Sequence, residues 1–224
     1  ARFAEQYAHA RGVGIDSLAR ISGWGHRTAG LRLLDKFERS RDAAYVFPHL
    51  RQTIEDAWRR AGVSGIEAMH GVETHDCFTT TEYVALDHLG LTPAGQSWQA
   101  VEDGSIEPGG RCPVNMSGGL IGCGHPVGAT GARMLLDAAQ QVTAQAQACQ
   151  IEGAQRMQTL NIGGSCATVV SFVVERGPLA PNPTVERLPD DELHREEPGP
   201  VVLEQLEPRV HARSEEHTSE LQSP

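Results

Sequence analysis

The sequence is poor in aromatic residues, in lysine and in long hydrophobic runs. Only 5% of its 224 residues are aromatic, and Lys36 is the single lysine beside 18 arginines. No apolar run approaches the ~20 residues of a membrane-spanning helix, and no basic stripe offers a nucleic-acid-binding surface. The formal net charge is −10, but −7 of it falls from Asn182 onward. We therefore expect a soluble protein with no membrane span, no nucleic-acid partner and a nearly neutral folded part.

Cysteine is scarce and lacks the spacing of a zinc site. The five cysteines make an odd number, and none of them stands in a C-x-x-C pair. No signal peptide precedes them, so we expect reduced thiols and a cytoplasmic protein. The excess of arginine over lysine, with abundant alanine and glycine, favours a bacterial source.

Both ends of the chain differ from its middle. The sequence opens in a helical pattern without an initiating methionine, so residues 1–22 are interpreted as the remnant of a preceding half or linker. Eight of the 13 prolines lie at or after Pro178, in an acidic stretch. Residues 178–224 are therefore predicted to form a disordered tail, and residues 23–177 the folded domain. Residues 213–223 resemble a translated sequencing adapter, which would make the last residues artefactual.

Helix and strand patterns alternate within the folded part. Helices are predicted over residues 3–11, 48–61, 79–89 and 127–146, and strands over residues 18–22, 66–74, 157–162 and 165–175. This alternation predicts an α/β layered fold, with a mixed sheet flanked by helices.

Several local signals set the expected boundaries. Pro48 and Gly62 bound one helix, and Thr79 with Glu82 predicts a capping box. Residues 23–26 are predicted to form a loop, and Gly163-Gly164 a tight hairpin turn. The inward face of the last helix is predicted to carry Ala132, Leu135, Leu136, Ala139 and Val142.

The densest group of functional candidates is rich in glycine. Residues 115–131 read N-M-S-G-G-L-I-G-C-G-H-P-V-G-A-T-G. Such a segment permits positive φ and close backbone approach, but its spacing differs from the G-x-G-x-x-G of a dinucleotide loop. His125, fixed by Pro126 at the start of a helix, could donate a hydrogen bond to an oxyanion or take a proton from a thiol. Alternatively, it merely closes the loop.

Two further clusters lie where strands end. In His75-Asp76-Cys77-Phe78, the dipole of the following helix favours a thiolate at Cys77, although a buried cysteine can also be a small core residue. A metal site from His70, His75, Asp76 and Cys77 can be drawn, but no second ligand set of zinc-like spacing follows. The amides of residues 161–164, N-I-G-G, could form an oxyanion hole or simply a turn.

Together these motifs resemble those of the thiolase family. Residues 115–131 are similar to the pattern N-x-x-G-G-x-x-x-x-G-H-P-x-G-A-[ST]-G. Residues 75–78, H-D-C-F, resemble the sterol-carrier-protein type of thiolase, where most thiolases have N-E-A-F, and residues 161–164 fall where most have C-x-G-G. The resemblance covers residues 13–176. It implies the C-terminal half of a thiolase, in which two similar halves pack together and the chains form a homodimer, chiefly through the N-terminal half.

The resemblance also implies site roles. His125 would polarise the thioester carbonyl and help to activate the nucleophile, and His75 would replace the asparagine that usually holds an oxyanion-hole water. Cys77 would be the acid/base at the α-carbon of the second acyl-CoA, a role that most thiolases give to a cysteine at the position of Asn161. The Gly163 amide would contribute to a second oxyanion hole. Cys166, on the following strand, is not expected to replace the missing cysteine.

The predicted function is that of an acyl-CoA acyltransferase, acting in 3-ketoacyl-CoA thiolysis or acyl-CoA condensation through an acyl-cysteine. The nucleophilic cysteine of a thiolase belongs to its N-terminal half, so that half is an implied partner and this fragment alone should be inactive. CoA and acyl-CoA are implied as substrates, with no permanently bound cofactor. The alternatives are a thiolase-like aldolase or lyase acting on CoA-linked side chains with a partner subunit, and a non-catalytic acyl-CoA-binding protein.

Overall fold

A four-stranded mixed sheet forms the centre of the fold. The computed structural model describes residues 2–177. The strands lie in the order β1 (Ala19–Thr28), β4 (Thr168–Arg176), β3 (Arg156–Gly163) and β2 (Gly71–Thr74). The β1–β4 and β4–β3 pairs are antiparallel, whereas β2 and β3 are parallel. Because Thr74 lies opposite Leu160, the carboxyl ends of β2 and β3 meet at the same edge of the sheet.

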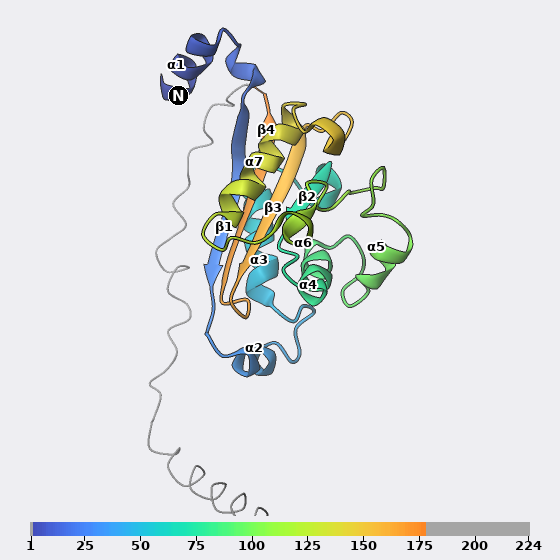
Figure 1. Cartoon of the computed structure of the whole chain (residues 1–224). Helices are drawn as coiled ribbons and strands as arrows, with labels where there is room; N and C mark the ends of the chain where they lie inside the picture. The colour runs from blue at the N-terminus through green and yellow to red at the C-terminus, as the bar shows by residue number, and fades with distance from the viewer. Residues whose placement is uncertain (1, 178–224) are drawn as a thin grey trace, which may run out of the picture. The chain divides into compact units, whose positions relative to one another are not determined.

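Helices cover both faces of this sheet (Figure 1). Helix α3 (Pro48–Ala61) packs against β1 and β4, and α7 (Thr130–Val142) packs against β3 and β4. The other helices are α1 (Arg2–Arg11), α2 (Leu33–Arg39), α4 (Thr79–Leu89), α5 (Trp98–Glu102) and α6 (Gly119–Cys123). Short 3-10 turns cover Ile15–Ser17, Ile66–Ala68 and Gln147–Cys149. The predicted α/β fold, with a mixed sheet flanked by helices, is confirmed.

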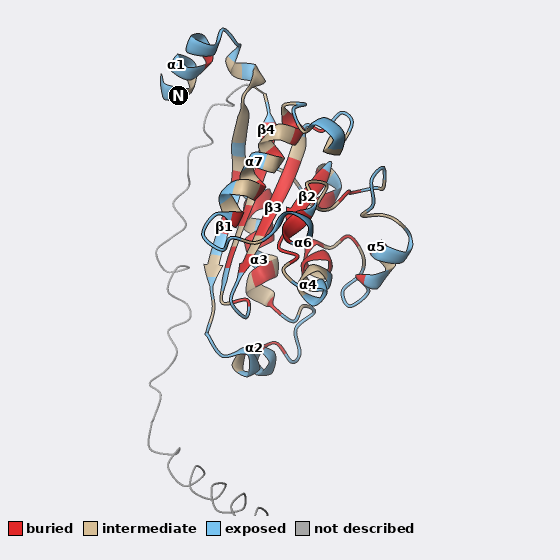
Figure 2. Ribbon diagram, in the orientation of Figure 1, coloured by how far each residue is buried: buried red, intermediate tan, exposed pale blue. Residues whose placement is uncertain are grey.

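The core has two layers, one on each side of the sheet. Val173 of β4 joins the larger cluster with α3, whereas its neighbour Val174 joins a smaller cluster with α7. Successive side chains of a strand point to opposite faces, so this split shows that the helices sit on opposite sides. Figure 2 shows the burial concentrated on the central strands.

Helix α3 begins and ends as the sequence predicts. Pro48 occupies the first turn, where its missing N–H needs no partner, and Gly62 ends the helix with a φ of 70°. Residues 23–26, by contrast, do not form the predicted loop but continue β1. A Cβ on Gly23 or Gly25 would collide with backbone oxygens of α3. The two glycines therefore allow the helix to lie close to the strand.

Three other local predictions are wrong in detail. The hairpin turn spans residues 164–167, with positive φ at Gly164 and Cys166, instead of the two residues Gly163-Gly164. Of the strand predicted over residues 66–74, only β2 forms. Its partner β3 begins at Arg156, opposite Glu175 of β4, and the next residue, Met157, pairs with Gly71. The residues before Gly71 therefore have no strand partner in β3. Thr79 forms no cap, because Phe78 is the N-cap and Thr79 is already helical.

Helix α7 is shorter than predicted, and it is turned differently. The chain remains a loop through Ala129, and the positions facing the sheet recur every fourth residue from Thr130. Of the predicted inward face, Val142 is buried and the half-buried Leu135 packs against the core, but Ala132 and Leu136 are exposed. The buried side chains are Thr130, Met134, Ala138, Gln141 and Val142. The apolar residues on the opposite side of α7 therefore do not contribute to the sheet core.

Within residues 2–177, no helix combines the length and the apolar character needed to cross a membrane. The predicted disordered tail and the adapter-like end lie outside the described residues. The domain boundaries placed after residues 22 and 177 stay predictions.

Candidate active site

The carboxyl end of β2 carries the H-D-C-F motif from the core to the surface. All four residues of β2 are buried. His75 and Asp76 remain buried, Cys77 is half-buried, and Phe78 is 71% exposed. Cys77 therefore lies where the buried strand reaches solvent, and it is not the fully buried core cysteine of the alternative interpretation.

The glycine-rich segment lies across this end of β2. Asn115 accepts a hydrogen bond from the Thr74 N–H through Oδ1 at 2.7 Å, and its own N–H donates to the Val72 carbonyl at 2.8 Å. Positive φ angles at Asn115 and Gly118 then turn the chain into the short helix α6. The two motifs, about 40 residues apart in sequence, are thus joined by direct hydrogen bonds.

This arrangement brings the two motif histidines together. The imidazole rings of His75 and His125 lie edge to face, with their centroids 4.8 Å apart and an interplanar angle of 86°. His75 comes from the end of β2, and His125 from the loop between α6 and α7. The fold thus places the histidines of the two motifs in direct contact.

Hydrogen bonds around Thr130 assign the tautomer of neutral His125. The Thr130 hydroxyl donates to the Pro126 carbonyl at 3.2 Å, so its oxygen accepts from His125 Nδ1–H at 2.7 Å. The neutral imidazole then has its lone pair on Nε2. Such a nitrogen can take a proton as a base, and the resulting imidazolium can donate a hydrogen bond to an oxyanion.

His75 is held in its neutral form. Burial lowers the pKa of His75, and the nearby His125 lowers it further, although Asp76 acts in the opposite direction. Among residues 2–177, His75 Nδ1 is a buried atom without a hydrogen-bond partner. Because a buried nitrogen of this kind is costly to leave unpaired, it is suited to a small polar ligand.

The cysteines differ sharply in their surroundings. Burial raises the pKa of both the Cys112 and the Cys166 thiols to about 12, so these two remain protonated at neutral pH. Cys77 lies just before the N-cap of α4, with its Sγ 3.6 Å from Thr81 Oγ1. The buried position of Cys166 agrees with the expectation that it does not replace the cysteine missing at position 161.

The third motif reaches the same edge of the sheet from β3. Asn161 follows Leu160, the residue that lies opposite Thr74, and its amide nitrogen lies 3.0 Å from the Met134 sulfur of α7. Gly163 ends β3 on exposed backbone, opposite Thr168 of the hairpin. His75 lies in ring contact with His125, whereas Gly163 is related to the two histidines only through this shared edge of the sheet.

Sequence reasoning missed a buried carboxylate next to the site. Glu73 is fully buried in β2 and accepts two hydrogen bonds from Ser117 of the glycine-rich segment. No local signal distinguishes it, because the burial of this strand on both faces follows only from the tertiary fold. The alternative metal site is not formed, since no three His, Cys, Asp or Glu side chains within residues 2–177 are grouped to hold an ion.

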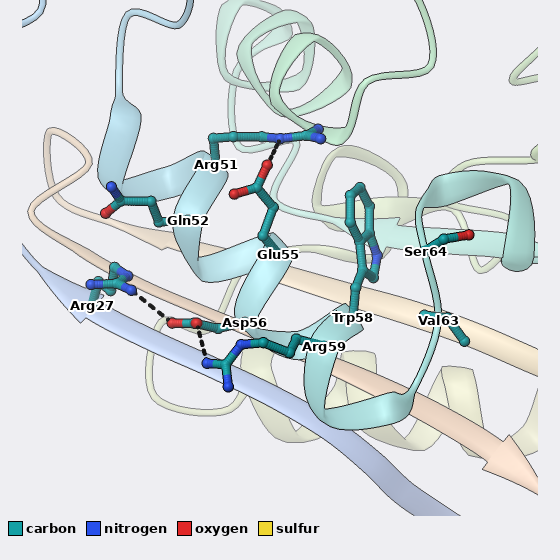
Figure 3. A pocket seen from close by; sticks show the side chains of 9 residues that line it. All are labelled: Arg27, Arg51, Gln52, Glu55, Asp56, Trp58, Arg59, Val63 and Ser64. Atoms are coloured by element: carbon teal, nitrogen blue, oxygen red, sulfur yellow. Dashed lines mark hydrogen bonds and ion pairs between the residues drawn. The ribbon is translucent and has the colours of Figure 1, made fainter. Parts of the chain in front are cut away.

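A groove of about 580 Å³ lies away from these histidines, along α3 (Figure 3). Its arginines are already paired: Arg27 and Arg59 contact Asp56 at 2.9 and 2.8 Å, and Arg51 contacts Glu55 at 2.7 Å. Three arginines thus share two carboxylates, and each guanidinium in the groove already has a carboxylate partner.

Comparisons with known proteins agree with these motifs. The family model of the thiolase C-terminal domain-like family matches residues 34–176. Acetyl-CoA acetyltransferase of Methanothermobacter thermautotrophicus is 40% identical over 105 residues, which are 47% of this chain and 27% of that protein. Benzoylsuccinyl-CoA thiolase subunit BbsB of Thauera aromatica is 34% identical over 116 residues, covering 51% and 30%. Human sterol carrier protein 2 is 40% identical over 101 residues, covering 45% and 18%.

Solved structures show a similar fold. The Ltp2-ChsH2(DUF35) aldolase matches 70% of this chain and 39% of its own, with a TM-score of 0.60 and 19% identity. The acetyl-CoA acetyltransferase of Bacillus anthracis matches 76% and 33%, with a TM-score of 0.50 and 18% identity. The chain thus spans less than half the length of these proteins. Because the family model covers most of the chain, the protein belongs to the thiolase family, with a thiolase C-terminal domain-like region at residues 34–176.

Proposed function

We propose that this chain supplies the C-terminal catalytic residues of a thiolase-like acyl-CoA acyltransferase. The observation that carries the proposal is the edge-to-face pair of His75 and His125, beside Cys77 at one edge of the sheet. The nucleophilic cysteine is proposed to come from an N-terminal half, so the fragment alone is inactive. CoA and acyl-CoA are the proposed substrates, and no permanently bound cofactor is needed.

His125 is proposed to act on both the nucleophile and the thioester. Its Nε2 lone pair takes the proton of the nucleophilic thiol as the thiolate attacks the acyl carbonyl. The protonated ring then donates a hydrogen bond to the oxygen that gains negative charge. The bond from Nδ1 to Thr130 supports this role, because it fixes the ring while leaving Nε2 available.

Cys77 is proposed as the acid/base of the second half-reaction. In condensation, its thiolate removes a proton from the α-carbon of the second acyl-CoA, and the resulting carbanion attacks the acyl-cysteine carbonyl. The C–S bond to the nucleophilic cysteine breaks, and a 3-ketoacyl-CoA leaves. In thiolysis, the Cys77 thiol returns its proton to the departing α-carbon.

The register of the sheet supports this placement of the acid/base cysteine. Most thiolases carry it where this chain has Asn161, at the end of β3. Since Thr74 lies opposite Leu160, the residues after β2 emerge at the same edge as those after Leu160. A cysteine that follows β2 can therefore place its thiol at the same edge of the sheet as a cysteine at the end of β3 in other thiolases.

Two oxyanion holes are proposed around these groups. His75, neutral at physiological pH, would hold a water molecule at its unpaired Nδ1 and so help His125 to bind one oxyanion. The Gly163 amide would contribute to the other, at the exposed end of β3. This assignment leaves Asn161 without a proton-transfer role.

The partner is proposed to be an N-terminal thiolase half, in a protein that forms a homodimer. Three apolar side chains around the site face solvent in this chain: Phe78, Ile121 and Val127 are 71%, 63% and 80% exposed. They come from the same two motifs as the catalytic residues. Exposed apolar side chains of this size are typical of an interface, which supports a partner surface that covers the two motifs.

A thiolase-like aldolase that acts with a partner subunit is the second candidate. It is supported by the structural likeness to the Ltp2-ChsH2(DUF35) aldolase, which shares the fold at 19% identity. The retained Cys77 and His125 favour acyl transfer over aldol cleavage, because the aldol reaction needs no acyl-cysteine. A non-catalytic acyl-CoA-binding protein would need neither residue.

The deciding experiment is to recover the upstream reading frame and to express the contiguous protein. We expect a cysteine in a C-x-S setting, CoA-dependent cleavage of a 3-ketoacyl-CoA, and a covalent acyl-cysteine detectable by mass spectrometry. Absence of that cysteine, together with cleavage of a β-hydroxyacyl-CoA in the presence of a partner subunit, would replace the transferase with the aldolase. Binding of acyl-CoA without turnover of either substrate would support the non-catalytic protein.

A further inference from the structure

Two buried carboxylates extend from the end of β2 to the glycine-rich segment. Glu73 lies within the strand, and Asp76 lies three residues later, on either side of His75 in sequence. Both are buried, and each accepts hydrogen bonds from the segment that carries His125. The glycine-rich segment is therefore attached to the end of β2 by hydrogen bonds to carboxylates, and not by apolar packing alone.

Glu73 holds the first part of the segment with both of its carboxylate oxygens. Its Oε2 accepts from the Ser117 hydroxyl at 2.6 Å, and its Oε1 accepts from the Ser117 N–H at 3.2 Å. The residues around this carboxylate come from α7: Arg133, whose Nη1 lies 3.4 Å from Ser117 Oγ, and Asp137, which pairs with Arg133 at 3.1 Å. Glu73 is therefore the centre of a small polar network between β2, the loop and α7.

Asp76 holds the second part of the segment. Its Oδ1 accepts from the Leu120 N–H at 2.6 Å, in the first turn of α6. A Cβ on Gly119 would collide with this carboxylate, so the glycine allows the close approach that the bond requires. The segment is thus fixed at Ser117 and at Leu120, on both sides of the point where it turns into α6.

We propose that Glu73 and Asp76 are positioning residues that hold the glycine-rich segment on the end of β2, and thereby set the contact between the His75 and His125 rings. The importance of that contact for chemistry rests on the proposed function. Glu73 and Asp76, with their hydrogen bonds to Ser117 and Leu120, are called the clamp. The clamp does not rest on the proposed function, because it is a property of this chain.

The choice of residue type supports the proposal. A buried carboxylate is costly unless it is hydrogen-bonded, whereas charge-assisted bonds to backbone N–H groups are shorter and stronger than neutral ones. An apolar side chain would fill the same space but would leave the Ser117 and Leu120 amides without these acceptors. Glycines on both sides make the segment flexible, so fixed acceptors are needed to give it one conformation.

The clamp can be tested by NMR on this chain. Glu73→Leu removes both acceptors at similar volume, Glu73→Gln keeps one acceptor oxygen without the charge, and Glu67→Leu is the control at an exposed glutamate that precedes the same strand. We expect the Ser117 amide to exchange with solvent about tenfold faster or more in Glu73→Leu, with an intermediate rate in Glu73→Gln. Amides of α3 should be unchanged in all three variants.

A second readout follows the two rings directly. In the unmodified chain, their 4.8 Å separation predicts a nuclear Overhauser effect between the His75 and His125 imidazole protons. This effect should be lost in Glu73→Leu, weakened in Asp76→Ala, and retained in Glu67→Leu. If a Glu73 variant does not fold, Ser117→Ala removes the hydroxyl bond from the other side and should weaken the same effect.

The ionisation of Glu73 gives a readout that a purely structural residue would not show. Burial raises the pKa of Glu73 to about 7, with Asp137 adding to the rise and the bonds to Ser117 and the charge of Arg133 opposing it. The Ser117 amide shift should therefore titrate near pH 7, and Glu73→Gln should abolish this titration.

Unchanged exchange at Ser117 and an intact effect between the rings in Glu73→Leu would overturn the proposal, whatever the activity of the contiguous protein. Conversely, loss of both readouts would support the clamp even if the contiguous protein proved to be an aldolase.

Discussion

The two faces of the sheet are built from different kinds of residues. On the α3 face, the side chains of Leu50, Ile54 and Ala57 are fully buried against the sheet, and the helix has a proline start and a glycine stop. On the α7 face, the structure buries Glu73 and His75 and leaves Leu136 57% exposed. The first face is mainly apolar, and its buried Gln158 is hydrogen-bonded to Trp58 and Ser171, whereas the second combines the buried Glu73 and the unpaired His75 Nδ1 with exposed apolar side chains.

This contrast separates the residues that stabilise the fold from those that serve a site. Burial of an unpaired polar group destabilises a protein, and an exposed apolar side chain contributes little to its stability. Both features are therefore informative where they coincide, as they do around His75 and His125. Under the proposed function, the α7 face carries the chemistry and the contact with the N-terminal half, and the α3 face supplies the support.

The largest expected effect is on the α7 face, at Cys77, and it is measured in the protein expressed from the recovered upstream reading frame. Cys77→Ala should lower kcat by about 10² to 10⁴, because the proton transfer at the α-carbon loses its base. Acylation of the nucleophilic cysteine should survive, and mass spectrometry of the trapped acyl-enzyme measures it. Cys149→Ala, at a half-buried cysteine outside the three motifs in sequence, is the matched control. Normal turnover in Cys77→Ala would end its assignment as acid/base.

His125→Ala should act at the other step. The loss of its oxyanion contact should slow acylation itself by roughly 10² to 10³, so little acyl-enzyme should accumulate. Rapid-quench measurement of the acylation rate distinguishes this variant from Cys77→Ala. Equal acyl-enzyme levels in the two variants would show that the two residues do not act in separate steps.

The next effect compares the stability of the two faces. Ile54→Ala should lower the free energy of unfolding by about 2 to 5 kcal/mol, because it opens a cavity in the fully buried layer. Leu136→Ala, on the exposed side of α7, should change it by no more than about 0.5 kcal/mol. Urea unfolding of this chain measures both. A loss at Leu136 comparable with that at Ile54 would show that α7 is covered in this chain.

A smaller effect concerns pH. With a reference pKa of 4.5 and a folded pKa of about 7, Glu73 binds more protons in the folded state between these values. Its contribution to stability therefore falls as the pH rises from 4.5 to 7. The free energy of unfolding of Glu73→Gln, taken relative to that of the unmodified chain, should therefore rise by roughly 1 to 3 kcal/mol across this window. The difference between the two unfolding curves isolates Glu73 from other titrating groups, and a flat difference would contradict the raised pKa.

The smallest expected effect concerns the uncovered apolar surface. Ile121→Ser combined with Val127→Ser should reduce the binding of a hydrophobic dye and any self-association, because both side chains are exposed. Stability should change by no more than about 0.5 kcal/mol. Undiminished dye fluorescence in this double variant would place the apolar surface elsewhere.

The sequence predicted best what depends on neighbouring residues. Helix α3 was predicted with its ends, because Pro48, Gly62 and the spacing of Leu50, Ile54 and Trp58 are local signals. The strand at residues 23–26 was missed, because Gly23 and Gly25 are explained only by the approach of a helix distant in sequence. Glycine in isolation favours a loop, and only tertiary packing reverses that preference.

The same limit applies to the candidate site. The motif resemblance singled out His75, Cys77, His125 and Gly163, but no spacing indicated that the two rings lie edge to face. Glu73 was missed, because a lone carboxylate reads as an exposed residue until the burial of its strand is known. Its role depends on Ser117, which is 44 residues away in sequence.

The position of β4 has a consequence for the order in which the protein can form. Of the strands within residues 2–177 it is the last in sequence, yet in the sheet it lies between β1 and β3. Thr28, the last residue of β1, pairs with Thr168 of β4, so about 140 residues are synthesised before this first strand meets its neighbour. At ordinary translation rates this delay is on the order of 10 s. During that time β1 is an unpaired strand that can aggregate with other chains. Slow synthesis of the intervening segment should therefore reduce the yield of folded protein.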